Sequence, residues 1–70
     1  MKIVEASMAG TVWKVLVEAG NNVEAGQTVI ILESMKMEIP LEVVESGTVK
    51  SISVSEGDFV NEGDVLLELE

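Results

Sequence analysis

The residues best placed to do chemistry lie in the segment Glu33-Ser34-Met35-Lys36-Met37-Glu38. Lys36 is one of only four lysines, and the chain has no arginine. It stands between two flexible, oxidisable methionines, and a glutamate closes the segment on each side. A primary amine can form a stable amide with a carboxylic acid. A lysine set apart in this way is therefore a candidate for covalent attachment of an acid-bearing group.

The rest of the composition supplies little for catalysis by the chain alone. It has no Cys, His, Tyr or Arg, so most of the usual acid–base, nucleophilic and charge-clamping groups are missing, as are the preferred ligands of structural zinc. An exposed lysine amine is mostly protonated at neutral pH and is a weak nucleophile. Only carboxylates are available beside Lys36, so we expect a non-catalytic protein whose lysine is activated by a separate enzyme.

The net charge of −9, from 13 acidic and 4 basic residues, restricts the partners. It argues against nucleic acid and against an anionic membrane surface, which both attract Lys and Arg. No apolar run has the length of a signal peptide core or a transmembrane helix, so we expect a cytoplasmic protein. The acidic residues gather at turns, but their spacing matches no EF-hand calcium loop, and we predict no metal site.

The chain contains two copies of one unit. Residues 1–33 overlay residues 38–70 without a gap, at an offset of 37 positions, with 10 identities in 33 aligned positions. The identities include all six glycines, in three pairs: Gly10 with Gly47, Gly20 with Gly57, and Gly26 with Gly63. We expect a single domain over residues 1–70, built from these two repeats and joined by a hairpin turn at 34–37.

Each repeat has the pattern of four short strands. In the first copy these cover residues 3–6, 11–17, the neighbourhood of Val23, and 28–33, separated by Gly-Asn and Gly-Gln turn signals. Val12 and Val15 break the two-residue alternation, which predicts a bend or a bulge. We interpret all six glycines as turn residues. Trp13 has Lys50 as its counterpart, so we interpret it as packed on the surface of a strand, with contact to a partner as the alternative.

These strands predict an all-β fold. Two four-stranded sheets would face each other about an approximate two-fold axis and close into a flattened β-barrel or sandwich. The first and last strands would lie side by side. Only Ser34 to Met37 lie between the repeats, so Lys36 should stand near the tip of a hairpin and near the axis. The flanking Met35 and Met37 could pack on the barrel end or contact partners, and the sequence leaves both possibilities open.

These features resemble the biotinyl/lipoyl attachment domain family over essentially the whole chain. The biotinyl branch carries Glu-Ala-Met-Lys-Met, and this chain has Glu33 to Met37 with Ser34 in place of Ala. The family's Met-x-Gly and Ser-Gly-Thr-Val elements correspond to Met8-Ala9-Gly10 and to residues 46–49. The chain lacks the protruding "thumb" of bacterial acetyl-CoA carboxylase carriers, so it is more similar to the thumbless carriers of pyruvate- and propionyl-CoA-type carboxylases and to small free-standing attachment proteins.

The resemblance implies a cofactor carrier whose attachment residue is Lys36. Met35 and Met37 would be the flanking motif, and Glu33, Ser34 and Glu38 its hairpin context. Biotin protein ligase would supply biotinyl-adenylate, and the partners of the loaded carrier would be a biotin carboxylase and a carboxyltransferase. The alternative is a lipoyl carrier, loaded by a lipoyl ligase, or a chain that accepts both biotin and lipoate. A structural or interaction barrel is a further alternative, and a Schiff-base enzyme is disfavoured because it needs a desolvated lysine.

Overall fold

The computed structural model describes residues 2–70, and Met1, the first residue of the predicted repeat, lies outside them. Eight strands follow in chain order: β1 (Lys2–Glu5), β2 (Gly10–Val15), β3 (Asn22–Val23), β4 (Thr28–Ser34), β5 (Met37–Glu42), β6 (Gly47–Ile52), β7 (Phe59–Val60) and β8 (Val65–Leu69). The prediction of an all-β fold is confirmed, with strand ends shifted by a residue or two. Residues 2–70 include no helix that is long and apolar enough to cross a membrane.

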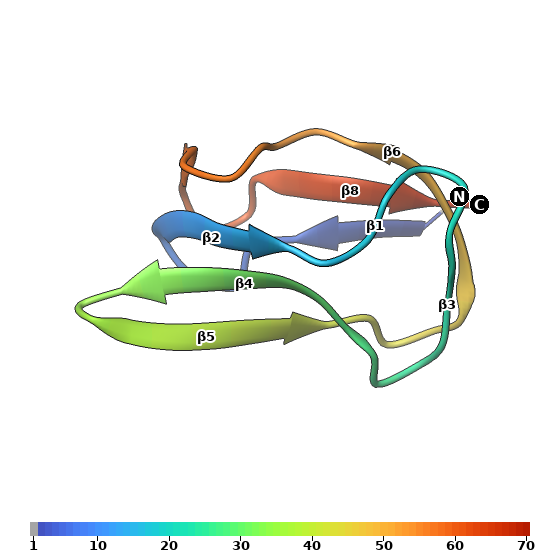
Figure 1. The fold of residues 1–70 in the computed structure, drawn as a ribbon, viewed down its shortest axis with the longest axis horizontal. Helices are drawn as coiled ribbons and strands as arrows, with labels where there is room; N and C mark the ends of the chain where they lie inside the picture. The colour runs from blue at the N-terminus through green and yellow to red at the C-terminus, as the bar shows by residue number, and fades with distance from the viewer. Residues whose placement is uncertain (1) are drawn as a thin grey trace.

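The strands form two antiparallel sheets, each drawn from both halves of the sequence (Figure 1). One sheet has the order β1-β8-β6-β3 and the other β5-β4-β2-β7. An offset of 37 residues converts the first order into the second, strand by strand. The predicted pair of four-stranded sheets with approximate two-fold symmetry is therefore confirmed, and the halves interleave instead of folding side by side.

The core lies between the sheets and repeats the same symmetry. It is aliphatic throughout, because β-branched and leucine side chains alternate inward along the short strands. Each buried residue has its counterpart 37 positions away either buried as well or packed against the core. The buried residues are Ala6, Val12, Val17, Val23, Val29, Ile30, Leu32, Leu41, Val43, Val49, Val60, Leu66, Leu67 and Leu69.

Turns of one half donate hydrogen bonds to strands of the other. The backbone N–H of Gly20 donates to the carbonyl of Val49 at 2.8 Å, and its counterpart Gly57 donates to Val12 at the same distance. These glycines have φ of 95° and 97°, which L residues with a Cβ rarely adopt. The expectation that all six glycines are turn residues is wrong for Gly10 and Gly47, which open strands β2 and β6.

Strand β2 carries the predicted bulge. Its register against β4 shifts between Val12 and Lys14, so Trp13 is left without a partner residue on that strand. The same shift occurs between Val49 and Ser51 in β6. Trp13 lies on the surface as expected, with 41% of its area exposed.

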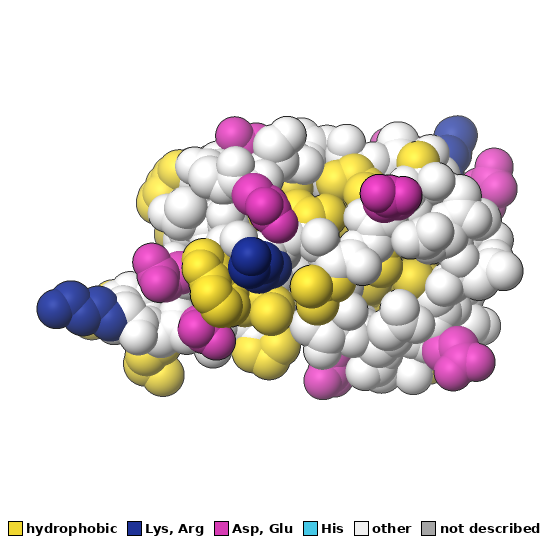
Figure 2. Space-filling model, viewed as in Figure 1, with side chains coloured by type: hydrophobic (Ala, Val, Ile, Leu, Met, Phe, Trp, Pro, Cys, Tyr) yellow, Lys and Arg dark blue, Asp and Glu magenta, His cyan; other side chains and the backbone are white. Residues whose placement is uncertain are grey.

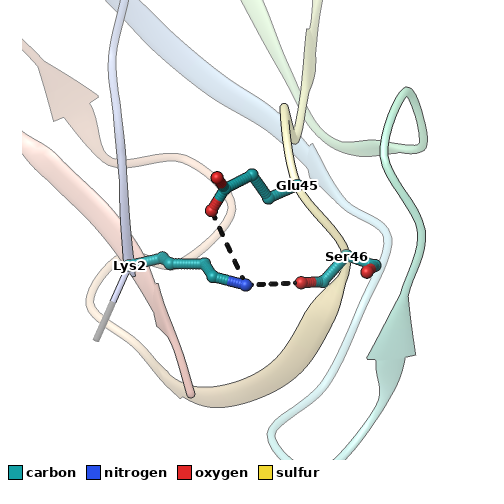
Figure 3. Close-up of polar contacts among 3 residues, drawn as sticks. All are labelled: Lys2, Glu45 and Ser46. Atoms are coloured by element: carbon teal, nitrogen blue, oxygen red, sulfur yellow. Dashed lines mark hydrogen bonds and ion pairs between the residues drawn. The ribbon is translucent and has the colours of Figure 1, made fainter.

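The ends of the described chain lie together, at the opposite end of the molecule from the β4–β5 connection (Figure 1). β1 pairs with β8 along its length, as predicted. Lys2 also makes two polar contacts beside β1. Its Nζ donates to the backbone oxygen of Ser46 at 2.7 Å and lies 3.6 Å from Glu45 Oε2 (Figure 3). Both charged side chains are well exposed, so this ion pair adds little to stability.

Interleaving predicts that neither half folds alone. Within residues 2–34 only β2 and β4 pair with each other, whereas β1 and β3 pair with strands of the second half. An isolated two-stranded hairpin is marginally stable at best in water. We expect a synthetic peptide of residues 1–34 to show no cooperative thermal transition by circular dichroism, while the full chain shows one. A peptide that melts cooperatively as a monomer would contradict this account.

Candidate functional site

The residues predicted as the functional site lie together on the hairpin that joins β4 to β5. Ser34, at the end of β4, pairs with Met37, at the start of β5. Strand pairing thus continues up to the loop itself, which consists of Met35 and Lys36 alone. The loop is shorter than the 34–37 segment expected from the sequence.

The backbone of this loop is unusual. Met35 has φ of 53° and Lys36 has φ of 64°, and they are the only residues other than glycine with positive φ in the described chain. Two consecutive positive φ values in a two-residue hairpin loop are the signature of a type I′ turn, whose twist matches that of the flanking strands. Asn-Gly is the usual sequence there, because glycine lacks a Cβ and the short polar side chain of asparagine can hydrogen-bond locally, whereas other L residues cost about 1–2 kcal/mol each in this conformation. The hairpin therefore carries local strain at Lys36 itself.

The side chains of the loop extend into solvent. Met35 is 91% exposed and Met37 is 65% exposed. The Lys36 side chain is exposed and makes no hydrogen bond or ion pair with any residue of the described chain. Figure 2 shows Lys or Arg side-chain atoms standing clear of the body of the molecule at the left of the view, where Figure 1 places the β4–β5 connection. The Lys36 amine is therefore accessible to another molecule.

The exposure of the two methionines bears on the alternatives left open by the sequence. Packing on the barrel end cannot explain Met35, which is almost fully exposed, and explains little of Met37. Contact with another molecule is the remaining interpretation for both methionines. The flexible methionine side chain can adapt to differently shaped surfaces.

Two glutamates face each other at the base of the hairpin. Glu33 on β4 lies directly opposite Glu38 on β5, and both are exposed. Like charges in this cross-strand position are destabilising by a fraction of a kcal/mol. Neither carboxylate pairs with Lys36, so the pair gives the base of the hairpin a negative potential instead of neutralising the lysine.

Gly10 sets how closely β2 approaches the hairpin. A Cβ added at Gly10 would lie 2.9 Å from the backbone oxygen of Glu33, closer than real Cβ contacts. The Met8-Ala9-Gly10 element of the sequence therefore has a structural reason: only glycine lets β2 pack against the end of β4 just before the loop. Sequence reasoning attributed this glycine to a turn and missed the close approach.

Two acidic residues at the other turns, Asp58 and Asp64, have a structural role. Asp58 Oδ2 accepts a hydrogen bond from the N–H of Ser55 at 2.8 Å, and Asp64 Oδ2 accepts one from Asn61 at the same distance. Each carboxylate thereby closes its own turn. No group of three or more potential metal ligands occurs among residues 2–70, and this part of the chain contains no pocket.

The chain is similar to known proteins over nearly its whole length. A protein family described as "Biotin-requiring enzyme" matches residues 2–69. The "Biotin/lipoyl attachment protein" of Bacillus subtilis is 64% identical over 66 residues, which cover 94% of this chain and 90% of that protein. Pyruvate carboxylase of the same organism is 48% identical over 67 residues, which cover 96% of this chain but 6% of the enzyme.

The fold is shared with a solved carboxylase structure. The urea carboxylase of Kluyveromyces lactis superposes with a TM-score of 0.92 at 35% identity, covering 99% of this chain and 6% of that one. The chain thus matches nearly the whole of a small protein and a small segment of much larger carboxylases.

The close approach at Gly10 predicts a stability loss in Gly10→Ala. The added methyl group meets the backbone oxygen and carbonyl carbon of Glu33 and Cβ of Ser34, all on β4. These atoms have little room to move, so we expect the free energy of unfolding to fall by about 1–3 kcal/mol. Denaturant titration would measure it, with Ser7→Ala in the exposed loop as a control that changes stability by less than about 0.5 kcal/mol. Equal stability of Gly10→Ala and the wild type would contradict the role assigned to Gly10.

The strained turn predicts that glycine suits position 36 better than other residues do. Lys36→Gly and Lys36→Ala both remove the charge and the long side chain, but only glycine tolerates a φ of 64° without strain. We expect Lys36→Gly to exceed Lys36→Ala in free energy of unfolding by about 0.5–1 kcal/mol, measured by denaturant titration. A more stable alanine variant would show that the loop does not hold this conformation in solution.

Proposed function

The chain belongs to the biotin/lipoyl attachment family, and we propose that it is a biotin carrier with Lys36 as the attachment residue. The observation that carries the proposal is the state of the Lys36 amine: exposed, unpaired, and held at the tip of a two-residue turn. Its flanking residues Met35 and Met37, and the hairpin context of Glu33, Ser34 and Glu38, complete the proposed site.

The attachment chemistry needs an activated acid. Nζ of Lys36, once deprotonated, attacks the carboxyl carbon of a biotinyl-adenylate. A C–N amide bond forms, the C–O bond to the phosphate breaks, and AMP leaves. The chain offers no base in contact with Nζ, since Glu33 and Glu38 do not pair with the amine. We therefore propose that a biotin protein ligase supplies both the adenylate and the acceptor of the proton.

The chain's contribution after attachment is mechanical. Biotin, when bound, carries an activated carboxyl group from one enzyme site to another. The lysine stem gives reach and freedom of rotation, and tethering keeps the local concentration of the group high at each site. The strand-paired base of the hairpin fixes the origin of the stem. The chain itself would have no catalytic role.

The partners follow from the carboxylases that share this fold. We propose that the loaded chain serves a biotin carboxylase and a carboxyltransferase, since segments like it occur within pyruvate carboxylase and urea carboxylase. The acceptor of the carboxyl group differs between those two named enzymes, so the carrier fold is compatible with more than one acceptor.

Lipoate is the second candidate cofactor, because the 64% identical relative is named for both biotin and lipoyl attachment. The exposed amine can form an amide with either acid. We favour biotin because Met35 and Met37 resemble the flanking residues of the biotinyl branch. A Schiff-base role suits Lys36 poorly, because its amine is fully hydrated at the tip.

Intact mass spectrometry tests the proposal. We expect protein produced in bacteria supplied with biotin and lipoate to carry one biotin-sized increment, which Lys36→Arg abolishes completely and Lys14→Arg leaves in place. Both substitutions keep the charge, so folding is not the variable. A lipoyl-sized increment would transfer the chain to the second cofactor, and an increment that persists in Lys36→Arg would refute the assignment of the site.

A further inference from the structure

The internal symmetry gives the molecule two equivalent outer sheet faces, and their residues differ. The outer face of the sheet β5-β4-β2-β7 carries Trp13, Ile31 and Phe59, which we call the Trp13 face. Strand register places them together. Ile31 on β4 lies opposite Lys14 on β2, and Phe59 on β7 lies opposite Thr11 on β2. Directly opposite residues share a face, and Trp13 follows Thr11 by two positions on the bulge of β2.

The equivalent positions on the other sheet are polar. An offset of 37 residues places Lys50 at the position of Trp13, Glu68 at that of Ile31 and Asn22 at that of Phe59. There the Thr48 hydroxyl lies 2.9 Å from Asn22 Oδ1 and donates a hydrogen bond to it. The outer face of this second sheet therefore folds with polar side chains at all three positions. The apolar residues of the Trp13 face therefore need a reason other than the fold.

The Trp13 face is accessible. Phe59 is 66% exposed and Trp13 is 41% exposed, with Lys14 Nζ 5.5 Å from the centre of its ring. Figure 2 shows apolar side chains gathered around one lysine on this side of the molecule, with acidic side chains near them. Aromatic residues surrounded by a polar rim are typical of protein–protein interfaces, and Trp is among the residues that contribute most to binding there.

The face lies directly behind the hairpin tip. Ile31 precedes Ser34 by three residues on β4, which is about 10 Å at the rise of a strand. Glu33 and Glu38 occupy the next row of the same face, between Ile31 and the tip. A protein that brings an active site to Nζ of Lys36 therefore meets both the glutamate pair and the apolar residues.

We propose that the Trp13 face is the docking surface for the ligase that acylates Lys36. The complementary surface of the ligase would have an apolar centre and basic residues around it. The inference rests on the proposed function. The ligase must reach Nζ itself, a few bonds from the backbone, so it must contact the barrel. Enzymes that act on the far end of the attached cofactor can do so at the length of the arm. A second copy is disfavoured because each copy carries a net charge of −9.

The symmetry supplies a matched test. The triple variant Trp13→Lys, Ile31→Glu, Phe59→Asn gives this face the residues of its counterpart and leaves the net charge at −9. The reciprocal variant Lys50→Trp, Glu68→Ile, Asn22→Phe alters the other face, also without a change of charge. Both are assayed as unmodified full chains with a purified bacterial biotin protein ligase, ATP, Mg²⁺ and biotin. Circular dichroism melting verifies that each is folded.

We expect KM for the triple variant to rise about tenfold or more with kcat nearly unchanged, and the reciprocal variant to match the wild type. Phe59→Asn alone should raise KM by about threefold, which keeps the test valid if the triple variant unfolds. A triple variant with wild-type kinetics, or an equal loss in the reciprocal variant, would overturn the inference while the proposed function stands. The inference would also be overturned if the wild type sediments as a dimer and the triple variant sediments as a monomer. A wild type that the ligase does not modify would overturn both.

Discussion

Backbone hydrogen bonds between the two halves of the chain hold the rest of the molecule in place. The turn at Gly20 donates to Val49, the turn at Gly57 donates to Val12, and four of the six glycines adopt positive φ to make such turns. Neither sheet exists without strands from both halves. The core, the position of β4 and the direction of the hairpin therefore depend on both halves, and Lys36 is placed by the whole barrel and not by its own segment.

The hairpin concentrates unfavourable terms at one end of the molecule. Met35 and Lys36 hold positive φ, Glu33 faces Glu38 across the strands, and Met35 is almost fully exposed. Each term is small, but together they describe a segment that is not optimised for folding. Strain and exposure of this kind collect where a surface must be presented to another molecule. The Gly10 contact and the pairing of Ser34 with Met37 supply the rigidity that the loop sequence lacks.

Much of the fold could be predicted from the sequence because the sequence contains two copies of the same structural repeat. The repeat located the strands, the central hairpin and the side-by-side end strands, and the broken alternation at Val12 and Val15 indicated the bulge. The other features depend on distances between residues that are far apart in the sequence or on local backbone geometry. Nothing in Met35-Lys36 resembles Asn-Gly, so the type I′ geometry could not be predicted. The 2.9 Å approach at Gly10 needs the coordinates of Glu33, and the Trp13 face appears only when register brings three separate strands together.

Two-fold symmetry also bears on how such a chain arises and how many groups it holds. Interleaved halves related by a two-fold axis are the arrangement that duplication and fusion of a gene for a self-associating half would produce. A dimer of separate halves would have two identical ends, each with two free termini. Fusion turns one end into a continuous loop and leaves the other open. Only the joined end has a place for Lys36, so the residue that we propose as acceptor occurs once per barrel.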